Sequence, residues 1–410
     1  MSESARRRPW ITRTVVGIAL ATCLSDFSHE MVTAILPLYL AQDGLGPAAL
    51  GVIEGIADFL VSLSKLAGGY AGHHLKQKKP LASLAYLVTA GATSAIGLVT
   101  TVPMLLGMRS IAWIARGFRG PLRDYMLSDA VEKTHYGRVF GLERAADMVG
   151  AIAGPLTATL LVYLGIQLKS IILVALIPGV LAASSMYFLA KEKVPDTGSS
   201  AQATAHADKP RFPRAYWLFL VGVLLFGLGD FSRTFLILIA AGGLKENGAL
   251  ASGTLSIAVL LYAMHNLVSA LTAYPVGHLG DKMSKRRILV VGYGLGVLTN
   301  LLLALAGGSL PMIIAAIALS GVYIAIEETL EKATVASLLP RELKSLGFGI
   351  LACANAVGDM ASSLYVGTLM SVGRSTLAFG IAAGLGSLGV LWMLAIAFQA
   401  SRGPKAASQT

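Results

Sequence analysis

The sequence is short of charged residues and of cysteines, and each shortage excludes a class of protein. Charged residues make up 13% and hydrophobic residues 55% of its 410 positions, and the mean hydropathy is +0.69. Water is not the main solvent of a chain with this composition. The two cysteines, Cys23 and Cys353, both fall within long apolar runs, so we expect neither a disulfide framework nor a cysteine metal site.

The sequence also lacks the motifs of nucleotide-driven machines and of enzymes. It contains no phosphate-binding glycine loop followed by Lys and Ser or Thr, which argues against nucleotide hydrolysis within this chain. No nucleophile, base and orienting group can be assembled from its motifs. We therefore expect neither enzymatic activity nor a bound cofactor.

Apolar runs long enough to cross a bilayer fill most of the chain. A membrane helix needs about 20 mostly apolar residues, and the sequence predicts an all-α membrane protein with twelve such helices. The first run is too long for a cleavable signal peptide and contains charges, so we expect it to remain in the mature protein. The predicted helices lie near residues 14–40, 47–70, 81–101, 104–124, 139–163, 168–190, 215–241, 250–276, 288–306, 310–332, 346–370 and 375–398.

The positive charges are distributed unevenly between the two sides of these helices. Most Lys and Arg residues fall on the side of the amino terminus, whereas Lys169, Lys245 and Arg374 fall on the other side. This asymmetry predicts that both termini are cytoplasmic in a bacterial inner membrane, or in a membrane derived from it. The net charge of +11 therefore indicates membrane orientation and no nucleic-acid partner.

The chain repeats itself on either side of a polar segment. Asp26 begins DFSH and Asp230 begins DFSR, 204 residues later, and Gly69 and Gly277 begin matching segments at an offset of 208. Internal repeats of this kind are typical of transporters built from two similar halves. We expect a six-helix bundle from residues 1–190, a cytoplasmic linker over 191–214, and a second bundle with a short tail over 215–410.

The loop after Gly277 resembles the basic loop motif of the major facilitator superfamily, and the resemblance covers nearly the whole chain. Asp281, Lys282 and Arg286 stand at the motif's spacing, whereas His73 takes the place of the acidic residue in the first half. In the superfamily this acid is thought to latch the cytoplasmic side of the two halves. The resemblance therefore implies a latch through Asp281. It does not imply an equivalent latch in the first half.

Two further motifs support the resemblance. GAIAGP, with Gly150, Gly154 and Pro155, is similar to a helix motif common in exporters of the superfamily, although it lacks the usual trailing glycines. RGFRGPLRD, which begins at Arg116, is richer in arginine than the usual single-arginine pattern. These motifs indicate the superfamily, give export a modest preference and leave the substrate open.

Ionisable residues inside the predicted helices are the candidates for function. Each costs at least about 2.5 kcal/mol near the bilayer centre, so it is expected to face the interior of the bundle. Asp26, His29 and Glu30 share one face of the first helix, and Asp230 and Arg233 take the equivalent place in the seventh. We expect these five residues to bind the substrate or to carry protons.

The fourth and tenth helices carry opposite charges at equivalent positions. Arg119 matches Glu327 at the offset of 208, and we expect these two to form a substrate or gating pair across a central cavity that the superfamily builds between its halves. We expect Glu143 and Asp147 to pair with arginines of the fourth helix. The charges expected to close or brace the cytoplasmic side are Arg116, Arg123, Asp124, Glu143, Arg144, Asp147, Asp281, Lys282, Arg286, Glu331 and Lys332.

The favoured function is secondary active transport of a small solute by alternating access. We expect a proton gradient to drive it through Asp26 and Glu30, with His29 as a relay, because buried carboxylates exchange protons near neutral pH. The expected partners are a small-molecule or ion substrate and the lipid bilayer, and the protein is expected to work as a monomer.

Two other functions remain open at this stage. A permease for metal ions such as iron, or for metal chelates, is suggested by His29, Glu30 and His265, whose nitrogen and oxygen atoms suit metals. A membrane scaffold or sensor that transports nothing would be expected to carry large soluble appendages, and the tails and linker of this chain are short.

Overall fold

The computed structural model describes residues 9–42, 47–192, 210–231, 235, 239 and 251–402. This part of the chain contains helices and no strand, which confirms the predicted all-α fold. Most of the predicted linker and Arg233 lie outside the described residues.

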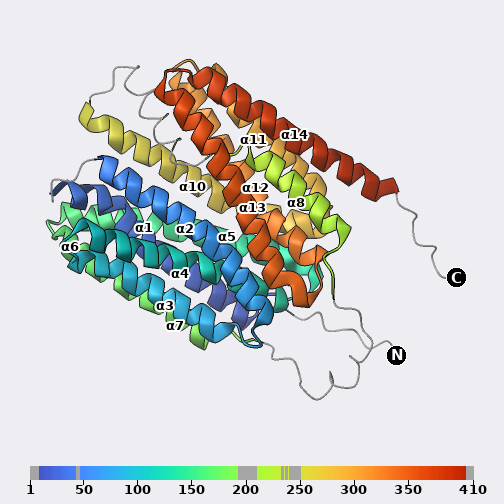
Figure 1. The fold of residues 1–410 in the computed structure, drawn as a ribbon, viewed down its shortest axis with the longest axis horizontal. Coiled ribbons are helices and arrows are strands. Elements are labelled where there is room, and N and C mark those ends of the chain that lie inside the picture. The colour runs from blue at the N-terminus through green and yellow to red at the C-terminus, as the bar shows by residue number, and fades with distance from the viewer. Residues whose placement is uncertain are drawn as a thin grey trace.

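The helices of the first half lie together in the lower part of Figure 1, coloured from blue to green. The predicted sixth helix is divided at Ala175 into α6 and α7. Pro178 explains this break, because proline has no N–H to donate to the carbonyl group of Val174 one turn earlier. The elements are α1 (Arg13–Gln42), α2 (Pro47–His74), α3 (Lys79–Ala95) with a 3₁₀ turn (Ile96–Leu98), α4 (Val102–Asp129), α5 (Tyr136–Tyr163), α6 (Leu168–Val174) and α7 (Leu176–Phe188).

The second half forms a similar bundle, coloured from yellow-green to red in Figure 1. The predicted seventh helix is described mainly through α8 and the residues just after it. The elements are α8 (Arg214–Gly227), α10 (Ala251–Lys282), α11 (Lys285–Leu305), α12 (Leu310–Leu338), a 3₁₀ turn (Arg341–Leu343), α13 (Lys344–Ser371) and α14 (Ser375–Arg402).

Seven of the described helical segments are long and apolar enough, by length and composition, to cross a membrane. The helix α4 is not among them, because Arg109, Arg116, Arg119 and Arg123 lower its hydropathy. Its arginines are nevertheless at least partly buried. The charges of α4 thus lie inside the bundle, as expected for ionisable residues in a membrane helix.

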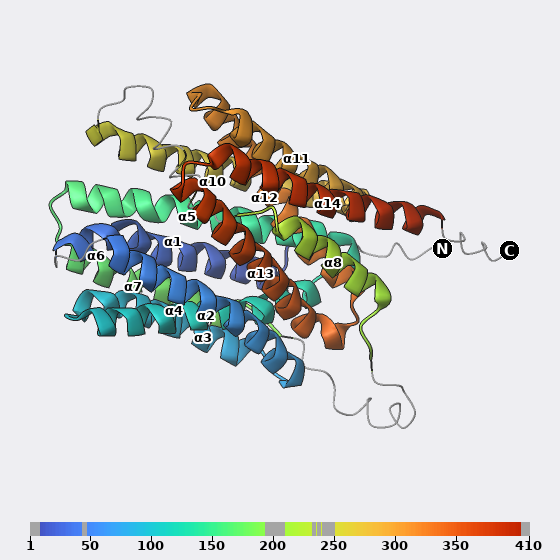
Figure 2. The same cartoon turned by 45° about the horizontal axis from the view of Figure 1, so that its top comes forward.

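The two bundles meet along two helix pairs, α5 with α10 and α2 with α13. Figure 2 shows α5 and α10 side by side between the bundles. Glycines allow this close approach: a methyl group on Gly277 would overlap the Gly137 carbonyl oxygen, and one on Gly349 would lie 2.9 Å from the Gly69 Cα atom. Gly69 and Gly277 are equivalent in the repeat, so the two contacts are related by the internal symmetry.

Candidate functional site

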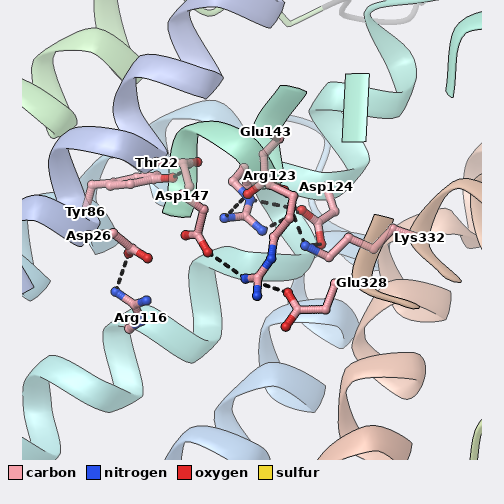
Figure 3. Close-up of polar contacts among 11 residues, drawn as sticks. Thr22, Asp26, Tyr86, Arg116, Arg123, Asp124, Glu143, Asp147, Glu328 and Lys332 are labelled. Carbon is pink, nitrogen blue, oxygen red and sulfur yellow. Dashed lines mark hydrogen bonds and ion pairs between the residues drawn. The ribbon is translucent and has the colours of Figure 1, made fainter. Parts of the chain in front are cut away.

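Polar side chains connect α1 and α4 in the middle of the first bundle. The guanidinium group of Arg116 lies 2.6 Å from the Asp26 carboxylate, as Figure 3 shows. One turn away, the His29 ring meets the edge of Trp113, with ring centroids 4.8 Å apart. Arg109 donates hydrogen bonds of 3.3 Å to the Thr33 hydroxyl group, which extends the row of contacts. We call these contacts the α1–α4 seam.

A second carboxyl group joins the seam from α5. The Asp147 carboxyl group lies within hydrogen-bonding reach of Asp26, and it accepts a hydrogen bond of 2.8 Å from Arg144. Two carboxyl groups in contact repel each other when both are charged, and one shared proton removes that repulsion. Glu30, predicted to act with Asp26, lies one turn further along α1, beside Gly154 of α5.

Arg144 connects this carboxyl pair to the second bundle. Its Nη1 atom lies 2.8 Å from Asp147 and 2.7 Å from Glu328 of α12. In Figure 3, dashed lines join the labelled Asp147 and Glu328 to one guanidinium group, which carries no label. The side chain of Glu328 is 25% exposed although it lies between the bundles. Arg144 therefore links a charge pair of one bundle to a carboxylate of the other, at a position that water reaches.

A second charge network crosses the same interface nearer the end of the molecule where α1 begins and α14 ends, here called the terminal end. Lys332 of α12 lies 3.4 Å from Glu143 and 3.9 Å from Asp124. Arg123 binds both acids, at 2.7 Å from Glu143 and 2.8 Å from Asp124. As expected from the sequence, Glu143 pairs with an arginine of the fourth helix.

The predicted pair of Arg119 and Glu327 is not formed. The Arg119 guanidinium carbon lies 3.8 Å from the ring centroid of Tyr86 on α3, within the first bundle. Glu327 is buried on α12, where the charges that act on it come from acids such as Asp230 and Glu331. Equivalent positions in the repeat place two residues on corresponding faces of related helices, which does not bring them together.

Two acids of the second bundle accept hydrogen bonds from hydroxyl and amide groups. Asp230 accepts a hydrogen bond of 2.8 Å from the Tyr323 hydroxyl group. Glu331 accepts one of 2.5 Å from Tyr293 and one of 2.8 Å from Asn355. The sequence analysis missed these donors, because a tyrosine or asparagine in an apolar helix gives no signal of its own.

Arg109 and Trp113 were also not predicted as site residues, although the sequence contains a signal for Arg109. Arg109 is fully buried within the predicted membrane segment 104–124. An arginine in such a segment is by itself a candidate functional residue.

Asp281 joins the bundles at the terminal end. Its carboxylate accepts hydrogen bonds from the backbone N–H groups of Gly137 (2.7 Å) and Arg138 (3.1 Å) at the start of α5. Burial raises the pKa of Asp281, and these two hydrogen bonds oppose that rise. At the equivalent position in the first half, a ring nitrogen of His73 lies 2.9 Å from the backbone carbonyl of Glu342.

The remaining predicted residues have simpler surroundings. Lys282 is exposed and Arg286 is half-buried. Gly150 and Gly154 pack against the backbone of α1 at Cys23 and Phe27, and Pro155 follows them within α5.

The suggested metal ligands do not come together. The imidazole of His265 lies 2.7 Å from the Ser320 hydroxyl group in the second bundle, whereas His29 packs against Trp113 in the first. Within the described residues, no group of three His, Cys, Asp or Glu side chains is arranged to hold a metal ion.

Comparisons with known proteins agree with this architecture. The sequence model described as Major Facilitator Superfamily matches residues 18–267 and 230–409. An MFS-type transporter of Methanocaldococcus jannaschii is 26% identical over 366 residues, 88% of this chain and 89% of that protein.

Two solved structures share the fold. The proton:xylose symporter XylE has a TM-score of 0.72 at 14% identity, over 93% of this chain and 95% of that one. A bacterial homologue of the iron transporter ferroportin, in an outward-facing state, has a TM-score of 0.69 at 12% identity, over 94% of this chain and 99% of that one. At these identities the likeness concerns the fold alone.

Proposed function

The chain belongs to the major facilitator superfamily and is a membrane transporter, and we propose that it moves a small solute by alternating access driven by protons. Family membership also disfavours the scaffold or sensor, because the matched family consists of transporters. No group in the described residues favours the metal permease.

The carboxyl pair of Asp26 and Asp147 is the observation that carries proton coupling. Both side chains lie in membrane-spanning segments and are largely buried. Arg116 binds Asp26 directly. A pair of this kind holds one proton more readily than two negative charges, and its proton is lost or gained when a nearby positive charge moves.

Arg144 gives the pair a route to the movement of the bundles. It divides its contacts between Asp147 of its own bundle and Glu328 of the other. A proton on the carboxyl pair weakens the Asp147 contact, so it changes how firmly Arg144 holds Glu328. The proposed coupling therefore needs no direct contact between proton and solute.

We further propose how the protein lies in the membrane. The side rich in Lys and Arg is the cytoplasmic side of a bacterial inner membrane, so the terminal end faces the cytoplasm. The exporter-like motif at Gly150, Gly154 and Pro155 favours outward transport. The protein is proposed to act as a monomer.

Uptake into inside-out membrane vesicles tests the coupling. Wild-type vesicles are given a mixture of metabolites and drugs, and the contents are compared by mass spectrometry with and without an imposed pH gradient. We expect Asp26→Asn and Asp147→Asn to reduce gradient-dependent uptake at least about tenfold at equal expression. The matched control is Glu132→Gln, an exposed acid between α4 and α5, which should transport normally. Gradient-dependent uptake that survives in both pair variants contradicts the proposal.

A further inference from the structure

Arg119 is a buried cation that no acid neutralises in the described part of the chain. Its side chain is 3% exposed, and its Nη1 atom has no hydrogen-bond partner. The described contact of the guanidinium group is with the ring of Tyr86. A charge taken out of water without a partner is costly, so a residue in this state is a candidate binding group for an anion.

Two described acids of the first bundle are already bound by other arginines. Asp26 is the carboxylate whose charge reaches Arg119, and it is held at 2.6 Å by Arg116. Asp147 is bound by Arg144. In the part of the first bundle that the structure describes, no acid is therefore left to neutralise Arg119, and its charge is available to a solute.

His29, in the α1–α4 seam, is a second buried polar group without a hydrogen-bond partner in the described part of the chain. It is 1% exposed, and neither of its ring nitrogens has a hydrogen-bond partner. The charges of Arg116, Arg109 and Arg119 all act on this ring. One nitrogen of a neutral imidazole carries an N–H group, so His29 has a hydrogen bond to donate among positive charges.

Aromatic rings accompany these donors, and the α4 backbone just after Arg119 has room beside it. A methyl group built on Gly120, the residue after Arg119, would meet no atom within 4 Å. The rings of Tyr86 and Trp113 lie against Arg119 and His29 respectively. Arginine binds carboxylates through its planar fork of N–H groups, and aromatic rings favour a solute with a flat apolar body.

We propose that Arg119 is an anion subsite, with His29 as a further hydrogen-bond donor in the same bundle, and that the transported solute is a small organic acid that binds Arg119 through its carboxylate. This inference rests on the proposed transport function, since it names the class of solute that the transporter carries. The two proposals concern different residues, because Asp26 and Asp147 bind the proton whereas Arg119 binds the solute.

Binding of three related probes to purified protein tests the subsite. Replacing Trp10, Trp217 and Trp392 with Phe leaves Trp113 as the one tryptophan, whose emission reports on the seam. The probes are benzoate, benzamide and benzylammonium, which share a ring and differ in charge. We expect benzoate to change the emission with an affinity at least about tenfold above that of the other two.

Variants identify the residue responsible. Arg119→Gln should weaken benzoate binding at least about tenfold, and Arg119→Lys, which keeps the charge and loses the fork, should weaken it less. Arg374→Gln removes an exposed arginine between α13 and α14 and serves as the control. An elution profile like that of the wild type in size-exclusion chromatography verifies that each variant is folded.

Three outcomes overturn the subsite: no response to benzoate, an equal response to benzamide or benzylammonium, or benzoate binding unchanged in Arg119→Gln. The test is separate from that of the transport function. Benzoate binding through Arg119 in a protein that accumulates no solute would refute the transport proposal alone. Gradient-driven uptake restricted to cationic solutes would refute the subsite alone.

Discussion

Lys344 illustrates how a single residue is constrained at the junction of the bundles. Its side chain is 5% exposed, and its ammonium group donates a hydrogen bond of 2.6 Å to the Tyr136 hydroxyl group. The two residues are 208 positions apart, so they occupy equivalent places in the repeat. Lys344 precedes the predicted membrane segment 346–370, and burial lowers the pKa of its ammonium group to about 8.

This pKa predicts a stability that rises with pH. The folded protein gives up the Lys344 proton at lower pH than the unfolded chain, whose lysines titrate near 10.4. The cost of burying the charge is therefore fully present below about pH 8 and is relieved between about pH 8 and 10. We expect the detergent-solubilised protein to gain about 1–3 kcal/mol across this range, measured as a rise in thermal unfolding temperature.

Lys344→Met should remove most of this dependence, because methionine fills similar volume without a charge. Lys282→Met, at an exposed lysine, should keep the wild-type profile. If Lys344→Met and the wild type show the same change of unfolding temperature with pH, the burial of Lys344 is not its cause.

At the scale of the helix, the contact of α1 with α5 depends on two glycines. A methyl group on Gly154 would lie 2.6 Å from the Phe27 carbonyl oxygen, and one on Gly150 would overlap the Cys23 carbonyl oxygen. Small residues at such contacts let helix backbones approach closely in lipid. The motif that resembles those of exporters thus has a packing role here, since it sets the distance between the helices that carry Asp26 and Asp147.

Gly154→Ala should therefore force α1 and α5 apart. We expect a loss of about 1–3 kcal/mol, seen as a lower thermal unfolding temperature in detergent, together with weaker proton-coupled uptake. Gly107→Ala in α4 is the matched control, because a methyl group there would meet no atom within 4 Å. Equal unfolding temperatures for the two variants would show that the α1–α5 contact tolerates a wider spacing.

At the scale of the whole molecule, the terminal end is held together unequally by the two halves. Asp281 accepts two backbone hydrogen bonds at the start of α5, where the partial positive charge of a helix favours an anion. The equivalent residue His73 meets a carbonyl oxygen before α13. The arrangement predicts that, of these two residues, Asp281 contributes most to the stability of the closed terminal end.

The rate at which a buried cysteine is alkylated measures how often the terminal end opens. Ser345 is fully buried beside Gly72 at the α2–α13 contact, so Ser345→Cys, with Cys23 and Cys353 replaced by Ser, should react with N-ethylmaleimide when the terminal end opens. Asp281→Asn should speed the reaction about tenfold, because a charge-assisted contact is lost. His73→Asp should slow it by adding a second anion at a helix start.

Lys282→Gln, next to Asp281 and exposed, should react like the parent. An unchanged rate in Asp281→Asn would mean that other contacts, such as that of Arg341 with Asp129 at 2.7 Å, keep the terminal end closed.

Particular residues show how far sequence reasoning reached. The predicted face of Asp26 and His29 does point at α4, because spacing along one helix fixes which side chains share a face. The partners of these charges were not predicted. Arg116 binds Asp26, and Asp147 of α5 lies beside it. Arg119, expected to pair with Glu327, packs on Tyr86. Nothing in the spacing along α4 distinguishes these two arginines.

The sequence by itself determined the helices, their two similar halves and the identity of the charges placed among apolar residues. Each run must satisfy its backbone hydrogen bonds within itself in lipid, so its length and composition suffice to define it. Only the tertiary structure decided which charges meet, and in particular that Arg144 spans the bundles while Arg119 has no acid partner among the residues that the structure describes. The rotation and depth of each helix depend on packing against neighbours from distant parts of the chain, and a side-chain contact is formed or lost within a few ångströms of that placement.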